Sequence, residues 1–238
     1  MTLEDWKDII FTDETAVQLG RVRGKRRVWR RANEAYHPHV IRRRWKGFKE
    51  FMFWGCFSYY EKGPCHIWVT ETAVEKKACI EDLKKRNAVV EAQNKAKWEA
   101  KQEEKEREFL EKHGRRKGGR KPTWKHTEET GAYVRKKGRG GIDWYRYQEV
   151  ILKKVLLPFA RKLKRTRPNV KVVEDGAPAH KSHHQQEIYD LWEVIRMTWP
   201  GNSPDLNAIE PCWFYMKRET TKRGLKGKKD MQERWVIV

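Results

Sequence analysis

The sequence lacks any long apolar segment. Nowhere in its 238 residues does an uninterrupted apolar run reach the length of about 18 residues that a membrane-spanning helix needs. The first residues, Met1 to Trp6, show neither the basic region nor the apolar region of a secretory signal. We therefore expect an intracellular chain without a membrane anchor. The length corresponds to one large domain, or to one domain with a sizeable insertion, at about 150 residues per domain.

Paired cysteines are also missing. The four cysteines (Cys56, Cys65, Cys79 and Cys212) form no C-x-x-C pair, which argues against a zinc ribbon and against a disulfide framework. We expect reduced thiols, most of them filling the core.

Motifs of two other enzyme classes are absent as well. There is no G-x-S-x-G sequence of a serine hydrolase. His180, His183 and His184 lie close together, but no H-E-x-x-H motif or neighbouring cysteine pair accompanies them, so a zinc site is disfavoured.

Acidic residues are scarce relative to basic ones. Lys and Arg number 54 against 33 Asp and Glu, a formal net charge of +21. Such an excess favours a polyanionic partner, with nucleic acid ahead of an anionic membrane surface. Charged residues make up 37% of the chain, so much of it must be solvated surface, yet twelve Trp argue against general disorder.

Apolar patterning predicts a mixed α/β domain. Residues 9–11 are expected to form a short buried strand followed by carboxylates, and runs at 51–57 and 66–70 complete a three-strand meander. A helix is expected from 142 to about 165 with a kink at Pro158, then a strand at 170–176 that ends in acid and glycine. A short helix at 183–194, a strand at 194–199 and a closing helix that carries Ile209, Trp213, Phe214 and Met216 follow.

A long helical insertion interrupts this pattern. Residues 74–112 are nearly free of Gly and Pro and carry eleven basic and ten acidic side chains, which predicts a long surface helix. Residues 114–140 are basic and punctuated by glycine, so we expect a mobile arm there.

The segment 16–49 is expected to form a hairpin or an extended loop that contacts nucleic acid. Between residues 21 and 49 there are twelve Lys or Arg and one acid, mixed with aromatic residues. Basic and aromatic side chains together suit phosphates and exposed bases. The predicted nucleic-acid contacts, which the resemblance described below assigns to DNA, are Arg21, Arg23, Lys25, Arg26, Arg27, Arg30, Arg31, Arg42, Arg43, Arg44 and Lys46.

Two predicted strands each deliver an aspartate at the carboxyl end, where open α/β sheets place their sites. Asp13 and Asp175 are this pair. Two carboxylates brought together repel each other unless a proton or a cation lies between them, and Mg²⁺ prefers such oxygen ligands. The alternative is that each is an ordinary turn residue at a strand end.

Three motifs extend this pair. Residues 199–210 read WPGNSPDLNAIE, followed by Trp213 and Lys217, residues 10–15 read IFTDET, and residues 173–180 read VEDGAPAH. In this order, and with thirty-four residues between Asp175 and Glu210, they closely resemble the signature of the mariner-type DDE transposases.

The resemblance implies a ribonuclease H-like mixed sheet flanked by helices, with Asp13, Asp175 and Glu210 as catalytic and metal-binding residues for two Mg²⁺ or Mn²⁺ ions. His180 and Asn207 would lie behind these ligands and support them. It implies cleavage and joining of DNA during cut-and-paste transposition in the nucleus, with transposon ends and target DNA as partners. A homodimer is expected by analogy alone.

The resemblance also implies a division of the chain. Residues 1–73 would be the first part of the catalytic domain, 74–140 a helical basic insertion, and 141–238 the second part. Complete transposases of this type carry an N-terminal helix-turn-helix region, whereas only about a dozen residues precede Asp13 here, so we expect this chain to lack it.

The sequence departs from the family pattern at three positions. Gly176 and Ala208 stand where many members have Asn and Pro, and Pro211 places Glu210 at a kink or near a helix start. If the strand register slipped by one residue, Glu14 and Glu174 would face the site instead. Two other functions stay open: a catalytically silent or domesticated DNA-binding protein, and a general ribonuclease H-type nuclease.

Overall fold

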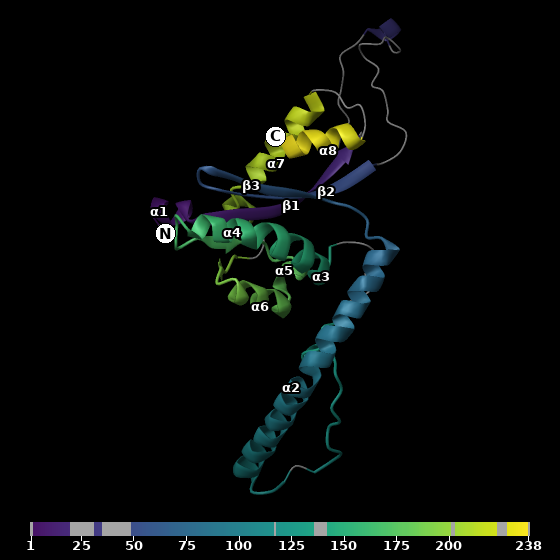
Figure 1. Ribbon diagram of the computed structural model, residues 1–238, viewed down its shortest axis with the longest axis vertical. Helices are drawn as coiled ribbons and strands as arrows, with labels where there is room; N and C mark the ends of the chain where they lie inside the picture. Colours follow the sequence, from purple (N-terminus) through teal and green to yellow (C-terminus); the bar gives the residue numbers. More distant parts are fainter. Residues whose placement is uncertain are drawn as a thin grey trace. The chain divides into compact units, whose positions relative to one another are not determined.

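The computed structural model of the chain describes residues 2–19, 31–34, 49–116, 118–135, 142–200, 203–222 and 228–237. It comprises two compact units, residues 1–69 with 144–238, and residues 70–143. Each unit is described by itself (Figure 1). The functional division into 1–73, 74–140 and 141–238 stays a prediction.

The first unit is built on a mixed five-stranded sheet. Its strands are β1 (Ile9–Leu19), β2 (Lys49–Ser58), β3 (Glu61–Trp68), β4 (Lys171–Val173) and β5 (Ile195–Arg196), in the order β3-β2-β1-β4-β5. The meander of β1, β2 and β3 is antiparallel, whereas β1, β4 and β5 run parallel. The predicted mixed α/β class and the predicted meander are confirmed.

Strand β1 is longer than the sequence suggested. Residues 16–19 were expected in a loop, but they continue the strand, because β2 pairs with β1 as far as Leu19 opposite Lys49. The parallel pairing of β1 with β4 ends earlier, with Phe11 opposite Val173. Asp13 therefore lies inside a strand and two residues beyond the end of its parallel ladder.

Two other strands differ from expectation. Strand β5 has two residues instead of the predicted six. Strand β3 starts at Glu61, ahead of Gly63 and Pro64. A side chain on Gly63 would meet the Cys56 carbonyl oxygen at 2.5 Å, so only glycine allows this close approach. Pro64 is tolerated because β3 is an edge strand.

Helices α7 (Glu210–Lys222) and α8 (Lys228–Ile237) cover one face of the sheet (Figure 1). Trp213 of α7 and Trp235 of α8 pack edge-on against Phe53, with ring centroids 5.7 and 5.1 Å away. This aromatic layer, joined by Phe11 and Phe51, is a core cluster of the domain. Helix α8 and the short α1 (Leu3–Lys7) were not expected from the sequence.

The opposite face carries α3 (Trp144–Arg146), η3 (Tyr147–Leu156), α4 (Leu157–Lys164), α5 (Pro178–Lys181) and α6 (His183–Leu191). The predicted helix from 142 to about 165 is confirmed in position, but its middle part, η3, is π-helical. The α-helical pitch resumes at Leu157, next to the expected kink at Pro158, which cannot donate a backbone hydrogen bond.

The second unit contains the predicted long helix, α2 (Ala73–His113). Thr72 and Glu75 form a capping box at its start, and Gly114 ends it with φ of 62°. The arm after α2 was expected to be mobile. Within its described residues, the part around Gly131 and Tyr133 is bound to α2, where Asn87 binds both backbone groups of Tyr133 and Asn94 donates to the Gly131 carbonyl.

The cysteines are free, as expected, but only Cys56 and Cys79 are buried, while Cys212 is exposed. In the part of the chain that the structure describes, no helix is long and apolar enough to cross a membrane.

Candidate active site

Asp13 faces the aromatic layer on the α7 side of the sheet. The Trp213 indole N–H donates to the Asp13 carboxylate at 2.8 Å. Asp13 pairs across β1 and β2 with Gly55. A Cβ on Gly55 would lie 3.0 Å from the Trp213 ring, so the missing side chain lets the indole lie close over β2 and reach Asp13.

The surroundings of Asp13 disfavour its charged form. Burial raises the pKa of Asp13 to about 7, and the charges of Glu210 and Glu14 add to this increase, although Trp213 and the Glu14 N–H oppose it. Lys217, which donates to the Thr15 hydroxyl at 2.5 Å, adds a positive charge near Asp13 and Glu210. Asp13 and Glu210 thus share one electrostatic environment.

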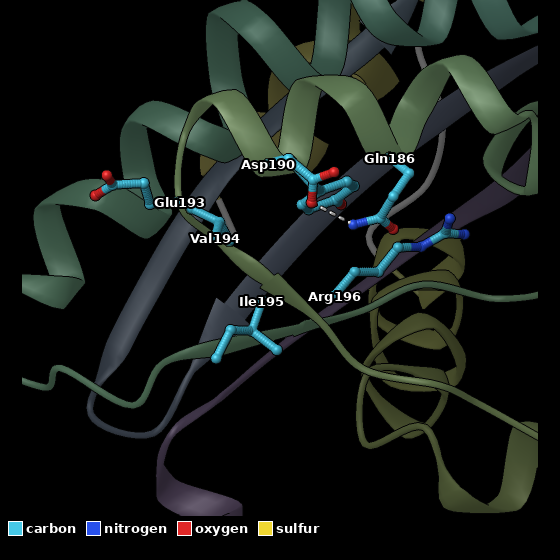
Figure 2. Close-up of a pocket in the computed structure, with 7 residues that line it drawn as sticks. Gln186, Asp190, Glu193, Val194, Ile195 and Arg196 are labelled. Atoms are coloured by element: carbon cyan, nitrogen blue, oxygen red, sulfur yellow. Dashed lines mark hydrogen bonds between the residues drawn. The ribbon is translucent and has the colours of Figure 1, made fainter.

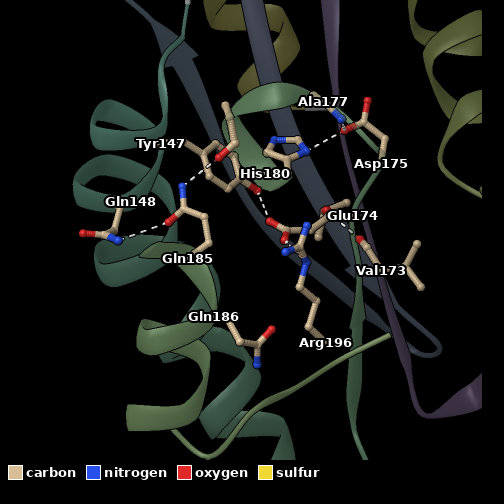
Figure 3. A network of polar contacts seen from close by, with 12 residues as sticks. Tyr147, Gln148, Val173, Glu174, Asp175, Ala177, His180, Gln185, Gln186 and Arg196 are labelled. Carbon is tan, nitrogen blue, oxygen red and sulfur yellow. Dashed lines mark hydrogen bonds and ion pairs between the residues drawn. The ribbon is translucent and has the colours of Figure 1, made fainter. Parts of the chain in front are cut away.

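Asp175 belongs to a different set of contacts. It follows the end of β4, and its Oδ1 lies 2.5 Å from Nδ1 of the buried His180 and accepts from the Ala177 N–H at 3.0 Å (Figure 3). The other ring nitrogen of His180 lies 3.3 Å from the Glu14 carboxylate. His180 therefore bridges the end of β4 to β1.

The pKa values in this bridge move in opposite directions. The hydrogen bond from His180 lowers the pKa of Asp175, and the Ala177 N–H and the Lys181 charge act in the same sense. Burial by itself would lower the pKa of His180, but the hydrogen bonds to Asp175 and Glu14 raise it well above the ordinary value. The two carboxylates therefore favour the charged form of the His180 ring between them.

Glu174 lies behind this bridge and away from solvent. Its side chain is fully buried, accepts from the Tyr147 hydroxyl at 2.5 Å and pairs with Arg196 at 2.9 Å (Figure 3). Glu14 and Glu174 therefore contact groups on the α5 and α6 side, whereas Asp13 contacts Trp213 of α7 on the other side. The sequence reasoning missed Tyr147 and Arg196, because neither lies in a motif.

Glu210 is the first residue of α7, as Pro211 predicted. Asn207, just after the 3-10 helix η4 (Pro204–Leu206), is buried and donates to the Thr12 carbonyl at 3.2 Å. This bond ties the segment that carries Glu210 to the strand that carries Asp13. Gly176 has no side chain, and the Lys181 amine lies close to it: a Cβ added to residue 176 would be 3.0 Å from the Lys181 Nζ atom.

The three predicted acids are placed as follows. Asp13 and Glu210 influence each other electrostatically, and Asp175 follows the strand adjacent to β1, held by His180. Among the described residues, no three His, Cys, Asp or Glu side chains already form a cation-binding group. The donor chemistry nevertheless fits a divalent cation, since these are oxygen ligands whose mutual repulsion a cation would relieve.

Of the eleven predicted DNA contacts, only Arg31 belongs to the described residues, where it is exposed next to η1 (Ala32–Glu34). The other ten lie outside them. An open pocket is present at α6 and β5, lined by residues that include Gln186, Asp190 and Arg196 (Figure 2). None of the three predicted acids lines it.

The fold resembles that of transposases of known structure. A pre-cleavage Mos1 transpososome matches with a TM-score of 0.52 at 12% identity, over 99% of this chain and 50% of that chain. A Mos1 transposase paired-end complex with the left transposon end gives a TM-score of 0.51 at 13% identity, over 98% and 48%. The sheet and its helices are therefore of the ribonuclease H-like class.

Sequence comparison identifies the family. The profile of the DDE superfamily endonucleases matches residues 98–232. The Tcb1 transposase of Caenorhabditis briggsae is 34% identical over 117 residues, 49% of this chain and 38% of that protein. The Tc3 transposase of Caenorhabditis elegans is 30% identical over 76 residues, 32% of this chain and 21% of that protein. The chain belongs to the DDE superfamily endonucleases, as a mariner-type transposase domain, and spans at most about half the length of these relatives.

Proposed function

We propose that this chain is the catalytic domain of a DNA transposase, which cleaves and joins phosphodiester bonds with Asp13, Asp175 and Glu210 as the ligands of two Mg²⁺ or Mn²⁺ ions. The observation that carries the proposal is the placement of Asp13, whose carboxylate accepts from Trp213 of α7 at 2.8 Å and whose burial raises its pKa to about 7, with a smaller increase from the charges of Glu210 and Glu14. A site with this property gains from binding a cation. Family membership supports the same activity.

Asp13 and Asp175 each have a supporting group. Trp213 holds one oxygen of Asp13 by a hydrogen bond, and Asn207 fixes the Thr12 carbonyl one residue before it. His180 orients Asp175 and keeps it ionised. The carboxylates of Asp13 and Asp175 are thus each oriented by a hydrogen-bonded neighbour, which is the arrangement that metal ligands need.

A divalent ion at these carboxylates would supply Lewis-acid activation of the attacking oxygen and stabilisation of the leaving oxygen. The protein's own residues position the DNA. The eleven Lys and Arg residues predicted to contact nucleic acid in the basic segment 16–49 would neutralise backbone phosphates. Lys217 adds a positive charge near Asp13 and Glu210. We infer that the DNA partners are transposon ends and target DNA, that the chain acts in the nucleus, and that it works as a homodimer.

The test is nicking and strand transfer on supercoiled plasmid DNA with Mg²⁺ or Mn²⁺. Asp13→Asn, Asp175→Asn and Glu210→Gln should each reduce both reactions by about a thousandfold or more, because several kcal/mol of charge stabilisation would be lost. Asp205→Asn is the matched control, since Asp205 is exposed in the same motif, and it should retain activity. Equal rates in wild type and Asp175→Asn would refute the proposal.

A calorimetric titration with Mn²⁺ separates the proposal from a catalytically silent DNA-binding protein. Binding by the wild type and its loss in Asp13→Asn supports the metal site, whereas no binding by the wild type favours the silent protein. Cleavage of RNA in an RNA–DNA hybrid without any DNA joining would indicate a general ribonuclease H-type nuclease instead.

A further inference from the structure

Helix α7 exposes two neighbouring aromatic side chains. The helix buries Trp213 and Met216 against the sheet, as its amphipathic spacing requires. Phe214 and Tyr215, in contrast, are 70% and 51% exposed. A phenylalanine this exposed adds little buried apolar area to the core. Together with Tyr215 it forms an apolar surface that is open to a contact with another molecule.

The position of Phe214 on the helix relates it to the candidate active site. Phe214 follows Glu210 by four residues, and side chains at this spacing lie on the same helix face, about 5–6 Å apart at their Cβ atoms. Lys217, three residues further, acts electrostatically on Asp13 and Glu210. Phe214 is thus one helical turn from the carboxylate that begins α7, on the strip that also carries Lys217.

Positive charge accompanies the aromatic pair. The Arg218 guanidinium lies over the Tyr215 ring, 5.4 Å from its centroid. Flat aromatic faces next to Arg and Lys are suited to a nucleic acid, since the rings stack on bases while the cations meet phosphates. The same combination would be less suited to an apolar protein surface, which would have to bury the charges of Arg218 and Lys217.

We propose that Phe214 and Tyr215 form a stacking platform for an unpaired base of the DNA strand at the candidate active site. Inside a duplex the base faces are covered by their neighbours, so an exposed ring stacks on an unpaired base in preference to a paired one. Staggered cleavage of the two strands would leave such unpaired bases. The inference rests on the proposed function for the identity of the DNA, and it concerns binding and not the chemical step.

The test measures binding of the whole chain to two probes without divalent cations. One probe is a short blunt duplex, and the other is the same duplex with a few unpaired nucleotides, one of them 2-aminopurine. The wild type should bind the extended probe more tightly and quench its 2-aminopurine fluorescence. Phe214→Ala should reduce this preference by about fivefold to a hundredfold, the range expected for the loss of one base–aromatic stack. Phe214→Trp should restore it.

Two control variants fix the interpretation. Tyr60→Asn removes a different exposed aromatic side chain, at a positive φ that asparagine tolerates, and Leu191→Ala removes another exposed apolar one. Both should keep the preference for the extended probe. Because Phe214 is mostly exposed, Phe214→Ala should fold normally, and an unchanged unfolding midpoint checks this.

Three results would overturn the inference. They are equal affinity of the wild type for both probes, an unchanged preference in Phe214→Ala, and a change of oligomeric state in Phe214→Ala with base binding intact, which would make the surface a protein contact. The proposed function fails separately, by loss of metal-dependent cleavage, because the binding assay contains no divalent cation. A preference for the extended probe in Asp13→Asn would show the platform working without catalysis.

Discussion

Asp13 lies inside β1 and Asp175 comes just after the parallel neighbour β4, yet their surroundings shift their pKa values in opposite directions. Asp13 meets the aromatic layer under α7, and its pKa rises to about 7 because burial outweighs the Trp213 hydrogen bond. Asp175 meets the His180 bridge, which lowers its pKa. The surroundings therefore disfavour ionisation of the Asp13 carboxyl group and favour ionisation of the Asp175 carboxyl group.

The difference bears on the proposed cation site, because it shows how two acids of the folded protein limit their mutual repulsion. If both acids were fully charged and close together, their repulsion would act directly on the folded state. Here the raised pKa of Asp13 lowers its charge near neutral pH, and the hydrogen bond from His180 offsets the charge of Asp175. A divalent ion would replace the proton on the first side and would compete with His180 on the second.

The largest expected effect concerns the buried ion pair between Glu174 and Arg196, which lies behind the His180 bridge. Arg196→Leu should reduce the free energy of unfolding by about 3–5 kcal/mol, because it leaves the fully buried Glu174 without its cation. Lys162→Ala, which removes an exposed partner of Glu61, is the control and should cost less than about 1 kcal/mol. Urea unfolding of both variants measures the difference. A loss of unfolding free energy below about 1 kcal/mol in both variants would mean that the pair of Glu174 and Arg196 does not stabilise the fold.

The next effect tests the contrast itself, by unfolding in the presence of a chelator. The folded pKa of Asp13, about 7, exceeds its unfolded value of about 3.9. Its contribution therefore favours the folded state below about pH 4 and is lost as the pH rises through 7. Asp13→Asn should raise the free energy of unfolding at pH 8 by about 2–4 kcal/mol relative to wild type, with little effect at pH 4.

Asp175→Asn is the counterpart on the other side and should have the opposite sign. A lowered folded pKa stabilises the protein above the unfolded pKa of about 3.9 and loses this contribution as the pH falls further. The variant should therefore be less stable than wild type at pH 8. Changes of the same sign in both variants would contradict the contrast.

A smaller effect is expected from Gly55→Ala. The new methyl group would lie 3.0 Å from the Trp213 ring and push the indole away from Asp13, at a cost of about 1–2 kcal/mol. Plasmid cleavage should fall with it, since Asp13 loses its orienting bond. Gly118→Ala, where the added methyl group has no neighbour within 4 Å, should stay within about 0.5 kcal/mol of wild type. Equal stability of the two variants would mean that the Trp213 indole does not need a glycine at position 55 to reach Asp13.

Much of the fold could be predicted from the sequence, because the relevant patterns are local. The β-branched run at 170–173, the Gly-free and Pro-free stretch that became α2, and Pro211 at the start of α7 all act through near neighbours in the chain. The full length of β1 could not be predicted, because residues 16–19 become a strand only by pairing with β2. Helix α8 was missed, since its hydrophobic residues are few and its burial depends on the aromatic layer.

The sequence by itself determined the family motifs, the order of the three acids and the excess of positive charge, since each of these is written in residue identity and spacing. Only the tertiary structure decided that Asp13 meets Trp213 across Gly55, that Asp175 meets His180, and that Glu174 is buried against Arg196. The physical reason is that a carboxylate's pKa and orientation depend on the groups within a few ångströms of it. In this protein some of those groups, such as Trp213 beside Asp13, lie 200 residues away along the chain.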